Sequence, residues 1–175
     1  MLQVLLAFLL FLSFFSCTLD RPEPINLGKD LCEYCRMAIA DKRFAAEVIT
    51  KKGRVYKFDS VECMVAYYNE NEEYIKKAYV ANFSNPEEFI EAEKAIYVRS
   101  QEIRSPMGMN LSAYKNREKA SSVKGEILDW KGLKELIKKK LLLKVLFKLL
   151  AYIFTAHPLF SKVFPSKLVR LHSSR

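Results

Sequence analysis

The chain has 175 residues, 50% of them apolar, and a formal net charge of +9. This length fits one domain with an appendage, and the apolar content can bury a core, which excludes a chain that is disordered as a whole. Five glycines and six prolines in a mixed composition exclude collagen-like, coiled-coil and mucin-like chains.

The positive charge is concentrated at the C-terminal end. Residues 131–175 contain nine lysines, two arginines and one acid, Glu135, so their net charge is +10. Residues 1–130 contain 18 basic and 19 acidic groups, a net charge of −1. A charge of +9 normally suggests a nucleic acid or an anionic membrane as partner, but here it says nothing about what the body of the protein binds.

The N-terminus has the pattern of a targeting segment. Residues 2–16 are uncharged and apolar, which suits the core of a signal peptide and is short for a membrane span. The small residue Ser16 directly before Cys17 resembles a bacterial lipobox, although no basic residue precedes the run and Phe14 stands where Leu is usual. We expect residues 1–16 to be a signal peptide, Cys17 to carry a lipid, and the protein to be anchored on the periplasmic side of a membrane. Cleavage that removes Cys17, or an uncleaved anchor, is the alternative.

The following sequence predicts a hairpin and a helix. Residues 17–31 contain prolines and are expected to form an extended tether before a body of residues 32–130. Within the body, residues 44–50 and the alternating 55–58 flank a turn, which is typical of a β-hairpin. Asp59 and Ser60 then offer N-cap chemistry, and an apolar stripe predicts a helix over about 60–77.

The second half of the body echoes the first. Residues 79–83, 95–98 and 126–130 are strand candidates, and 107–119 is a short helix or loop after the break at Ser105-Pro106. We therefore predict an α+β fold, a small domain of antiparallel β-hairpins and helices, with two similar ββα units as one interpretation and a C-terminal basic helix. This mixture argues against a doubly wound parallel sheet.

Soft sulfur side chains dominate the candidate chemistry, because residues 18–130 contain no His. Common zinc sites use four Cys or His ligands, and three thiols fall short of that number. Thiolates and thioethers suit a soft monovalent ion, above all Cu(I). Cys35 and Met37, two positions apart, share one face of a strand or turn. The sulfur residues in question are Cys32, Cys35, Met37, Cys63, Met64, Met107 and Met109.

Each sulfur group also has a structural alternative. Cys32 and Cys35 can close a disulfide in an oxidising compartment. Cys63 or Met64 can be a core residue of the helix, and the pair Met107 and Met109 can belong to a turn with one buried Met. A lone C-x-x-C is weak evidence, whereas the combined pattern of these motifs is far more specific.

The combined pattern resembles the NosL family, exported copper-binding accessory lipoproteins of nitrous oxide reductase maturation. The resemblance covers about residues 22–120, and the lipobox-like Cys17 fits it. The family commonly has Cys-Gly-Met where this chain has Arg36, so either the backbone differs there or the glycine never needed a positive φ. The matching segments are Cys32-Glu-Tyr-Cys35-Arg-Met37, Ala40-Asp41-Lys-Arg43-Phe44-Ala45-Ala46, Gly53, Phe58-Asp59-Ser60-x-x-Cys63-Met64, Ala95-Ile-Tyr97-Val98 and Pro106-Met107-Gly108-Met109.

This resemblance implies a copper chaperone and not an enzyme. Such a protein binds Cu(I) outside the cytoplasm and supplies it to a copper-sulfur centre such as that of nitrous oxide reductase. The family fold is described as paired ββα-type units. Carried over by position, Cys35 and Met37 match the copper-associated Cys-x-Met motif. The remaining candidates are Met107 and Met109 as second-half ligands, Cys32 as an auxiliary thiol, and Cys63 and Met64 as second-tier residues.

Two other functions remain open at this point. One is thiol–disulfide exchange through Cys32 and Cys35, although redox C-x-x-C pairs open a helix after a strand, and here the pair precedes β-like sequence. The other is a structural lipoprotein in which the pair is an inert staple. A hydrolytic enzyme is disfavoured because the body has no His and no recognisable nucleophile–base arrangement.

The basic tail predicts a separate element. Residues 133–156 favour a helix on which Lys140, Lys144 and Lys148 form one stripe, and the longest uncharged run, residues 149–161, is too short to span a bilayer. A basic amphipathic helix on an anionic membrane is the expected function, and nucleic-acid binding is disfavoured for an exported protein. The alternatives are a helix packed on the body, or a reading frame that runs past its true end, since residues 136–175 contain no acid.

Overall fold

The computed structural model describes residues 21–156, with side chains through residue 152. The predicted signal peptide, the lipidation site Cys17 and the last 19 residues lie outside this range. The chain divides into two units, one ending at Lys134 and the other beginning at Glu135, and each is described by itself.

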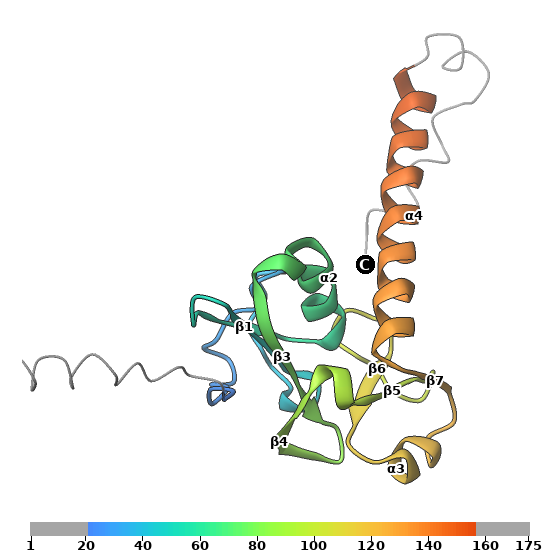
Figure 1. Ribbon diagram of the computed structural model, residues 1–175. Helices are drawn as coiled ribbons and strands as arrows, with labels where there is room; N and C mark the ends of the chain where they lie inside the picture. Colours follow the sequence, from blue (N-terminus) through green and yellow to red (C-terminus); the bar gives the residue numbers. More distant parts are fainter. Residues whose placement is uncertain (1–20, 157–175) are drawn as a thin grey trace, which may run out of the picture. The chain divides into compact units, whose positions relative to one another are not determined.

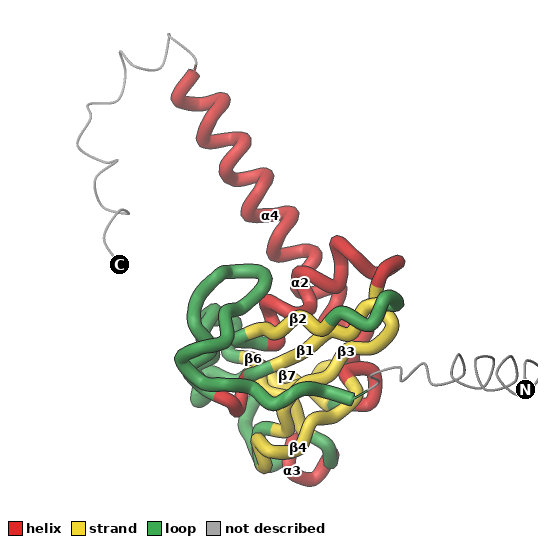
Figure 2. Tube along the Cα trace, turned by 90° about the vertical axis from the view of Figure 1, so that its left-hand side faces the viewer, coloured by secondary structure: helices red, strands yellow, loops and turns green. Residues whose placement is uncertain are grey.

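The first sheet contains four antiparallel strands in the order β2-β1-β3-β4 (Figures 1 and 2). The predicted hairpin is confirmed as β1 and β2, and Gly53 in its turn has a φ of +77°, which glycine adopts without steric cost. Strand β4 was not predicted. The strands are β1 (Ala46–Thr50), β2 (Val55–Phe58), β3 (Ile75–Asn82) and β4 (Asn85–Glu91).

The second sheet contains β5 (Ile96–Arg99), β6 (Leu111–Tyr114) and β7 (Glu126–Leu128) in the order β6-β5-β7. In both sheets the first strand in sequence is central. It pairs antiparallel with the next strand and, across a helix, with the strand after that. The helices are α2 (Val61–Asn71) and α3 (Arg117–Ser121). This repeated strand order confirms the α+β class and the pair of similar ββα units, each extended by one strand, with β4 as an additional edge strand of the first sheet.

Helix α2 begins where the sequence predicts and ends earlier. The Ser60 side chain accepts a hydrogen bond from the Cys63 N–H at 3.3 Å, which caps the helix. The predicted end at residue 77 is wrong, because a 3-10 turn follows α2 and β3 starts at Ile75, which pairs with Thr50 of β1. Ile75 was counted in the apolar stripe of the helix, but it is buried as a strand residue.

Aromatic rings join the two sheets and hold the beginning of the last helix. Phe83 contacts Phe44 and Tyr114, with ring centroids 5.4 and 5.7 Å apart. Trp130, the first residue of α4 (Trp130–Ala156), packs edge-on against Tyr68 of α2 at 5.1 Å. The first turn of α4 is therefore part of the body.

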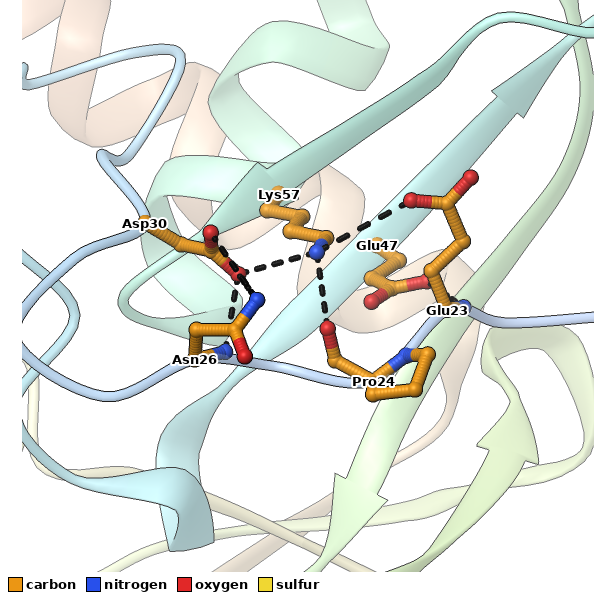
Figure 3. Close-up of polar contacts among 6 residues, drawn as sticks. All are labelled: Glu23, Pro24, Asn26, Asp30, Glu47 and Lys57. Atoms are coloured by element: carbon orange, nitrogen blue, oxygen red, sulfur yellow. Dashed lines mark hydrogen bonds and ion pairs between the residues drawn. The ribbon is translucent and has the colours of Figure 1, made fainter.

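Residues 17–31 were expected to form an extended tether. In the structure, the part of this segment drawn in Figure 3 is attached to the first sheet. The ammonium group of Lys57 lies 2.9 Å from Asp30 Oδ2 and donates to the Pro24 carbonyl at 2.8 Å. The Glu23 N–H donates to Glu47 Oε2 at 2.8 Å, and Ile25 is buried in a small apolar cluster. This segment belongs to the body, because polar contacts and apolar burial both attach it.

The part of α4 that belongs to the second unit, from Glu135 to Ala156, is a helix as predicted. Lysines recur along it at positions 138–140, 144 and 148. Among the described residues, no helix is both long enough and apolar enough to cross a membrane. The exposed apolar residues of this part of α4 are Leu142, Leu143, Val145, Leu146, Phe147, Leu149, Leu150 and Tyr152.

Candidate metal centre

Four side chains from two parts of the sequence meet at one point of the body. The sulfur atoms of Cys32, Cys35 and Cys63 and a carboxylate oxygen of Asp59 all lie within 4.8 Å of one another. Cys32, Asp59 and Cys63 are buried, whereas Cys35 is partly exposed. The cluster is thus enclosed on one side and reachable from solvent through Cys35. All three cysteines are free thiols in this structure.

A tight loop positions Cys32 and Cys35. The Cys32 N–H donates to the Met37 carbonyl at 2.8 Å, and the Arg36 N–H donates to the Cys32 carbonyl at 2.9 Å. The Glu33 N–H donates to the Lys57 carbonyl at 2.8 Å, which attaches the loop to β2. These backbone bonds hold both thiols without using either side chain.

The connection between β2 and α2 supplies the other two groups. Asp59 directly follows β2, and Cys63 stands in the first turn of α2, fixed by the Ser60 cap. From the sequence, Asp59 was expected to offer N-cap chemistry and was not among the candidate metal ligands. Its Oδ1 atom is buried and has no hydrogen-bond partner among the described residues. A buried carboxylate oxygen without a donor is costly, so this atom fits a metal ligand.

The thiols differ in their readiness to lose a proton. A hydrogen bond from Cys63, the largest influence, lowers the pKa of Cys32 to about 6, while the same contact raises the pKa of Cys63. Burial raises the pKa of Cys35 to about 11. The contact between the two thiols therefore favours the thiolate form of Cys32, the form that binds metal.

The fourth donor changes which metal ions the site suits. Zinc was disfavoured because only three thiols were counted, yet Asp59 supplies a fourth donor of a kind that zinc accepts. Donor number alone therefore does not separate zinc from a soft monovalent ion. What the geometry shows is a site that could hold a metal ion through three sulfurs and one oxygen.

The methionines occupy different environments. Met37 and Met107 are 47% and 40% exposed, Met109 is partly buried, and Met64 is fully buried in the core. The four converging groups described above are cysteine and aspartate side chains. Of the predicted site residues, the structure brings together Cys32, Cys35 and the second-tier Cys63.

A buried contact ties the second methionine loop to the helix of Cys63. The Ser105 hydroxyl donates a short hydrogen bond to Glu62 Oε1 and accepts one from the Asn110 N–H at 2.8 Å. Glu62 is buried on α2 directly before Cys63, and burial raises the pKa of its carboxyl group. The loop that carries Met107 and Met109 is thereby anchored to α2.

Arg36 occupies a backbone position that favours glycine. Its φ is +64°, in the left-handed region, and its guanidinium group donates to both carboxylate oxygens of Glu33 at 3.0 and 3.1 Å. The pair is exposed and contributes little to stability. The backbone at Arg36 therefore has a conformation that glycine adopts without steric cost.

Replacing Arg36 with glycine should stabilise the body. Relief of the left-handed strain should raise the free energy of unfolding by about 1 kcal/mol. Urea unfolding followed by Trp130 fluorescence measures this change. Arg36→Ala is the matched control, because it removes the ion pair and keeps the strain. An equal effect of both variants would show that the backbone is not strained here.

The fold and this cluster define a class: a small α+β protein built from two ββαβ units, with a thiol-rich site suited to a metal ion. The NosL family model matches residues 24–135, which is more than half of the chain. The crystal structure of the copper chaperone NosL from Shewanella denitrificans has the same fold, with a TM-score of 0.54 and 22% identity over 63% of this chain and 93% of that one. Among curated proteins, none matches the chain. The chain belongs to the NosL family.

Proposed function

We propose that this protein is an extracytoplasmic metallochaperone that binds Cu(I) at the Cys32–Cys35–Cys63 cluster and passes it to another protein. The observation that carries the proposal is the convergence of three free thiols in a member of the NosL family. A soft thiolate set is the donor type that Cu(I) prefers. The copper chaperone from Shewanella denitrificans, which shares the fold, supports the same function.

In this proposal the ligands divide into a fixed and an exchangeable group. Cys32 and Cys63 are buried and hold the ion from inside, while Cys35 lies at the accessible side. Met37 next to Cys35 supplies a neutral thioether that is easily displaced, and Met107 or Met109 supplies another from the anchored loop. Such an arrangement favours transfer over storage, because an incoming thiolate can bind before the first ligand leaves.

Anaerobic titration of the reduced full-length protein tests this function. We expect Cu(I) to bind in preference to Zn²⁺, and to protect the three thiols from alkylation. Cu(I) binding that leaves the thiols fully reactive would contradict the site. Reduction of protein disulfides by the metal-free protein, without Cu(I) binding, would favour thiol–disulfide exchange through Cys32 and Cys35.

We further propose that a lipid on Cys17 and the basic helix of residues 133–156 hold the protein at the outer side of a membrane. The exposed apolar side chains of α4 and its lysine stripe suit an anionic bilayer surface. The recipient is a copper enzyme of the nitrous oxide reductase type. Sedimentation with anionic vesicles should fall when Lys140, Lys144 and Lys148 are replaced by Gln, and unchanged sedimentation would contradict the role of the helix.

A further inference from the structure

A groove on the body lies beside the metal cluster and is not used by it. It has a volume of about 550 Å³ and is bounded by the β1–β2 turn and the end of α2. Its main lining residues are Lys51, Lys52, Arg54, Tyr56, Tyr67 and Tyr74.

The groove is positively charged. Lys51, Lys52 and Arg54 are exposed, and within the described part of the chain none of their side chains forms an ion pair with an acid. Nearby acids are engaged elsewhere, since Glu33 pairs with Arg36 and Glu72 pairs with Lys134. No acidic residue lines the groove. Three like charges in one concave surface attract an anionic group and pay no cost for breaking existing pairs.

Tyrosine rings give the groove its apolar part. The ring centroids of Tyr56 and Tyr67 are 5.4 Å apart, and the ring of Tyr67 also contacts that of Phe58 at 5.3 Å, tilted by 50°. The Arg54 guanidinium donates to the Tyr56 hydroxyl at 3.1 Å, which fixes both side chains. Rigid tyrosines beside arginine are characteristic of protein–protein contact sites. A small inorganic anion would interact with the positive charges of the groove but would not contact its tyrosine rings.

The groove and the cluster share one side of α2. Cys63, Tyr67 and Asn71 are spaced four residues apart, so they lie on one face of the helix. Cys63 belongs to the cluster, whereas Tyr67 and Asn71 line the groove. Phe58, whose ring contacts that of Tyr67, directly precedes the cluster residue Asp59. The groove residue Tyr67 therefore stands about one helical turn along α2 from Cys63.

The parts of the chain outside the body offer no acidic segment for this groove. Residues 1–20 contain one acid, Asp20, and residues 131–175 contain one, Glu135. We propose that the groove docks an acidic peptide segment of the protein that exchanges copper with the cluster. This inference rests on the proposed chaperone function and names the chemistry of its partner.

The test uses the full-length reduced protein and a defined probe. The probe is a synthetic peptide of alternating Glu and Gly with a Cys-x-x-Cys end and a photo-crosslinking residue, and its control has Gln in place of Glu. The groove variant carries Lys51→Ala, Lys52→Ala and Arg54→Ala. The matched variant carries Arg117→Ala, Lys119→Ala and Lys124→Ala, which remove the same charge near α3.

We expect the Glu peptide to crosslink to groove residues of the metal-free protein. From the Cu(I)-loaded protein, the Glu peptide should take Cu(I) about tenfold faster than the Gln peptide. The groove variant should lose both effects, while the matched variant keeps them. Crosslinks confined to residues 131–175, or equal losses in both variants, would overturn the proposal in favour of non-specific charge. Crosslinks that anionic vesicles abolish would show that the groove binds lipid instead.

The test of the groove can be distinguished from the test of the chaperone function. Cu(I) affinity, measured by competition with a chromophoric chelator, should be the same in the parent and both variants, since none of the six residues belongs to the cluster. A parent protein without Cu(I) binding would refute the chaperone function, whereas crosslinking tests the groove by itself. Cu(I) binding without selective crosslinking would refute the groove alone.

Discussion

Replacing Cys35 with serine should weaken Cu(I) binding by more than about 100-fold, since even residues that only orient metal ligands cost roughly 10–100-fold when removed. Serine keeps the size of the side chain but replaces a soft sulfur by a hard hydroxyl oxygen that Cu(I) binds poorly. Cys35 is the partly exposed member of the cluster, so the substitution disturbs the core less than at Cys32 or Cys63. Chelator competition under anaerobic conditions measures the affinity.

A matched substitution separates ligation from folding. Met64→Leu changes a sulfur residue next to Cys63 that is fully buried in the core, and should leave Cu(I) affinity within about twofold because nearly isosteric core changes are tolerated. Met37→Leu should have an intermediate effect if the thioether completes the site. Equal Cu(I) affinity in Cys35→Ser and the parent would remove Cys35 from the ligand set.

The sequence predicts this site only in part, and the limits have physical causes. Spacing alone indicates that Cys32 and Cys35 are neighbours. Cys63 is 28 residues beyond Cys35, and it joins them only because β2 ends at Phe58 and the chain turns directly into α2. Asp59 was recognised as a residue with capping chemistry, but Ser60 performs the capping and leaves the aspartate free for the cluster. Which of two adjacent polar residues caps a helix depends on backbone angles that the sequence does not specify.

The fold, too, could be predicted from the sequence only in part. The hairpin was predictable because alternation and a glycine turn agree, whereas β4 contains Pro86 and three acids, a composition typical of no strand interior. It forms nevertheless because it is an edge strand, paired only with β3, where proline and charge are tolerated. The end of α2 was misplaced because Ile75 continues the helical stripe and yet pairs with Thr50. Pairing with a neighbouring strand, which the pattern of the segment itself does not contain, decided both cases.

The contribution of Glu47 to the stability of the body should fall as the pH rises from about 4.5 to 7. This side chain is fully buried on β1, and burial, only partly offset by the Glu23 N–H and Lys57, raises the pKa of its carboxyl group from 4.5 to about 7 (Figure 3). In this interval the folded protein keeps a proton that the unfolded chain has lost, so the free energy of unfolding falls with pH. The loss contributed by Glu47 is up to about 3 kcal/mol and is complete above pH 7.

Glu47→Gln should flatten this dependence, because the amide is neutral at every pH and its oxygen can still accept the Glu23 N–H. Glu62, whose pKa burial also raises, contributes with the same sign, so the slope should shrink and not vanish. Urea unfolding at pH 5 and pH 7.5, followed by Trp130 fluorescence, measures the difference. Glu118→Gln, at an exposed position of α3, should keep the slope of the parent. Parallel pH curves for the parent and Glu47→Gln would mean that Glu47 is already ionised in the folded protein. Its carboxylate would then be stabilised by the Glu23 N–H and by Lys57.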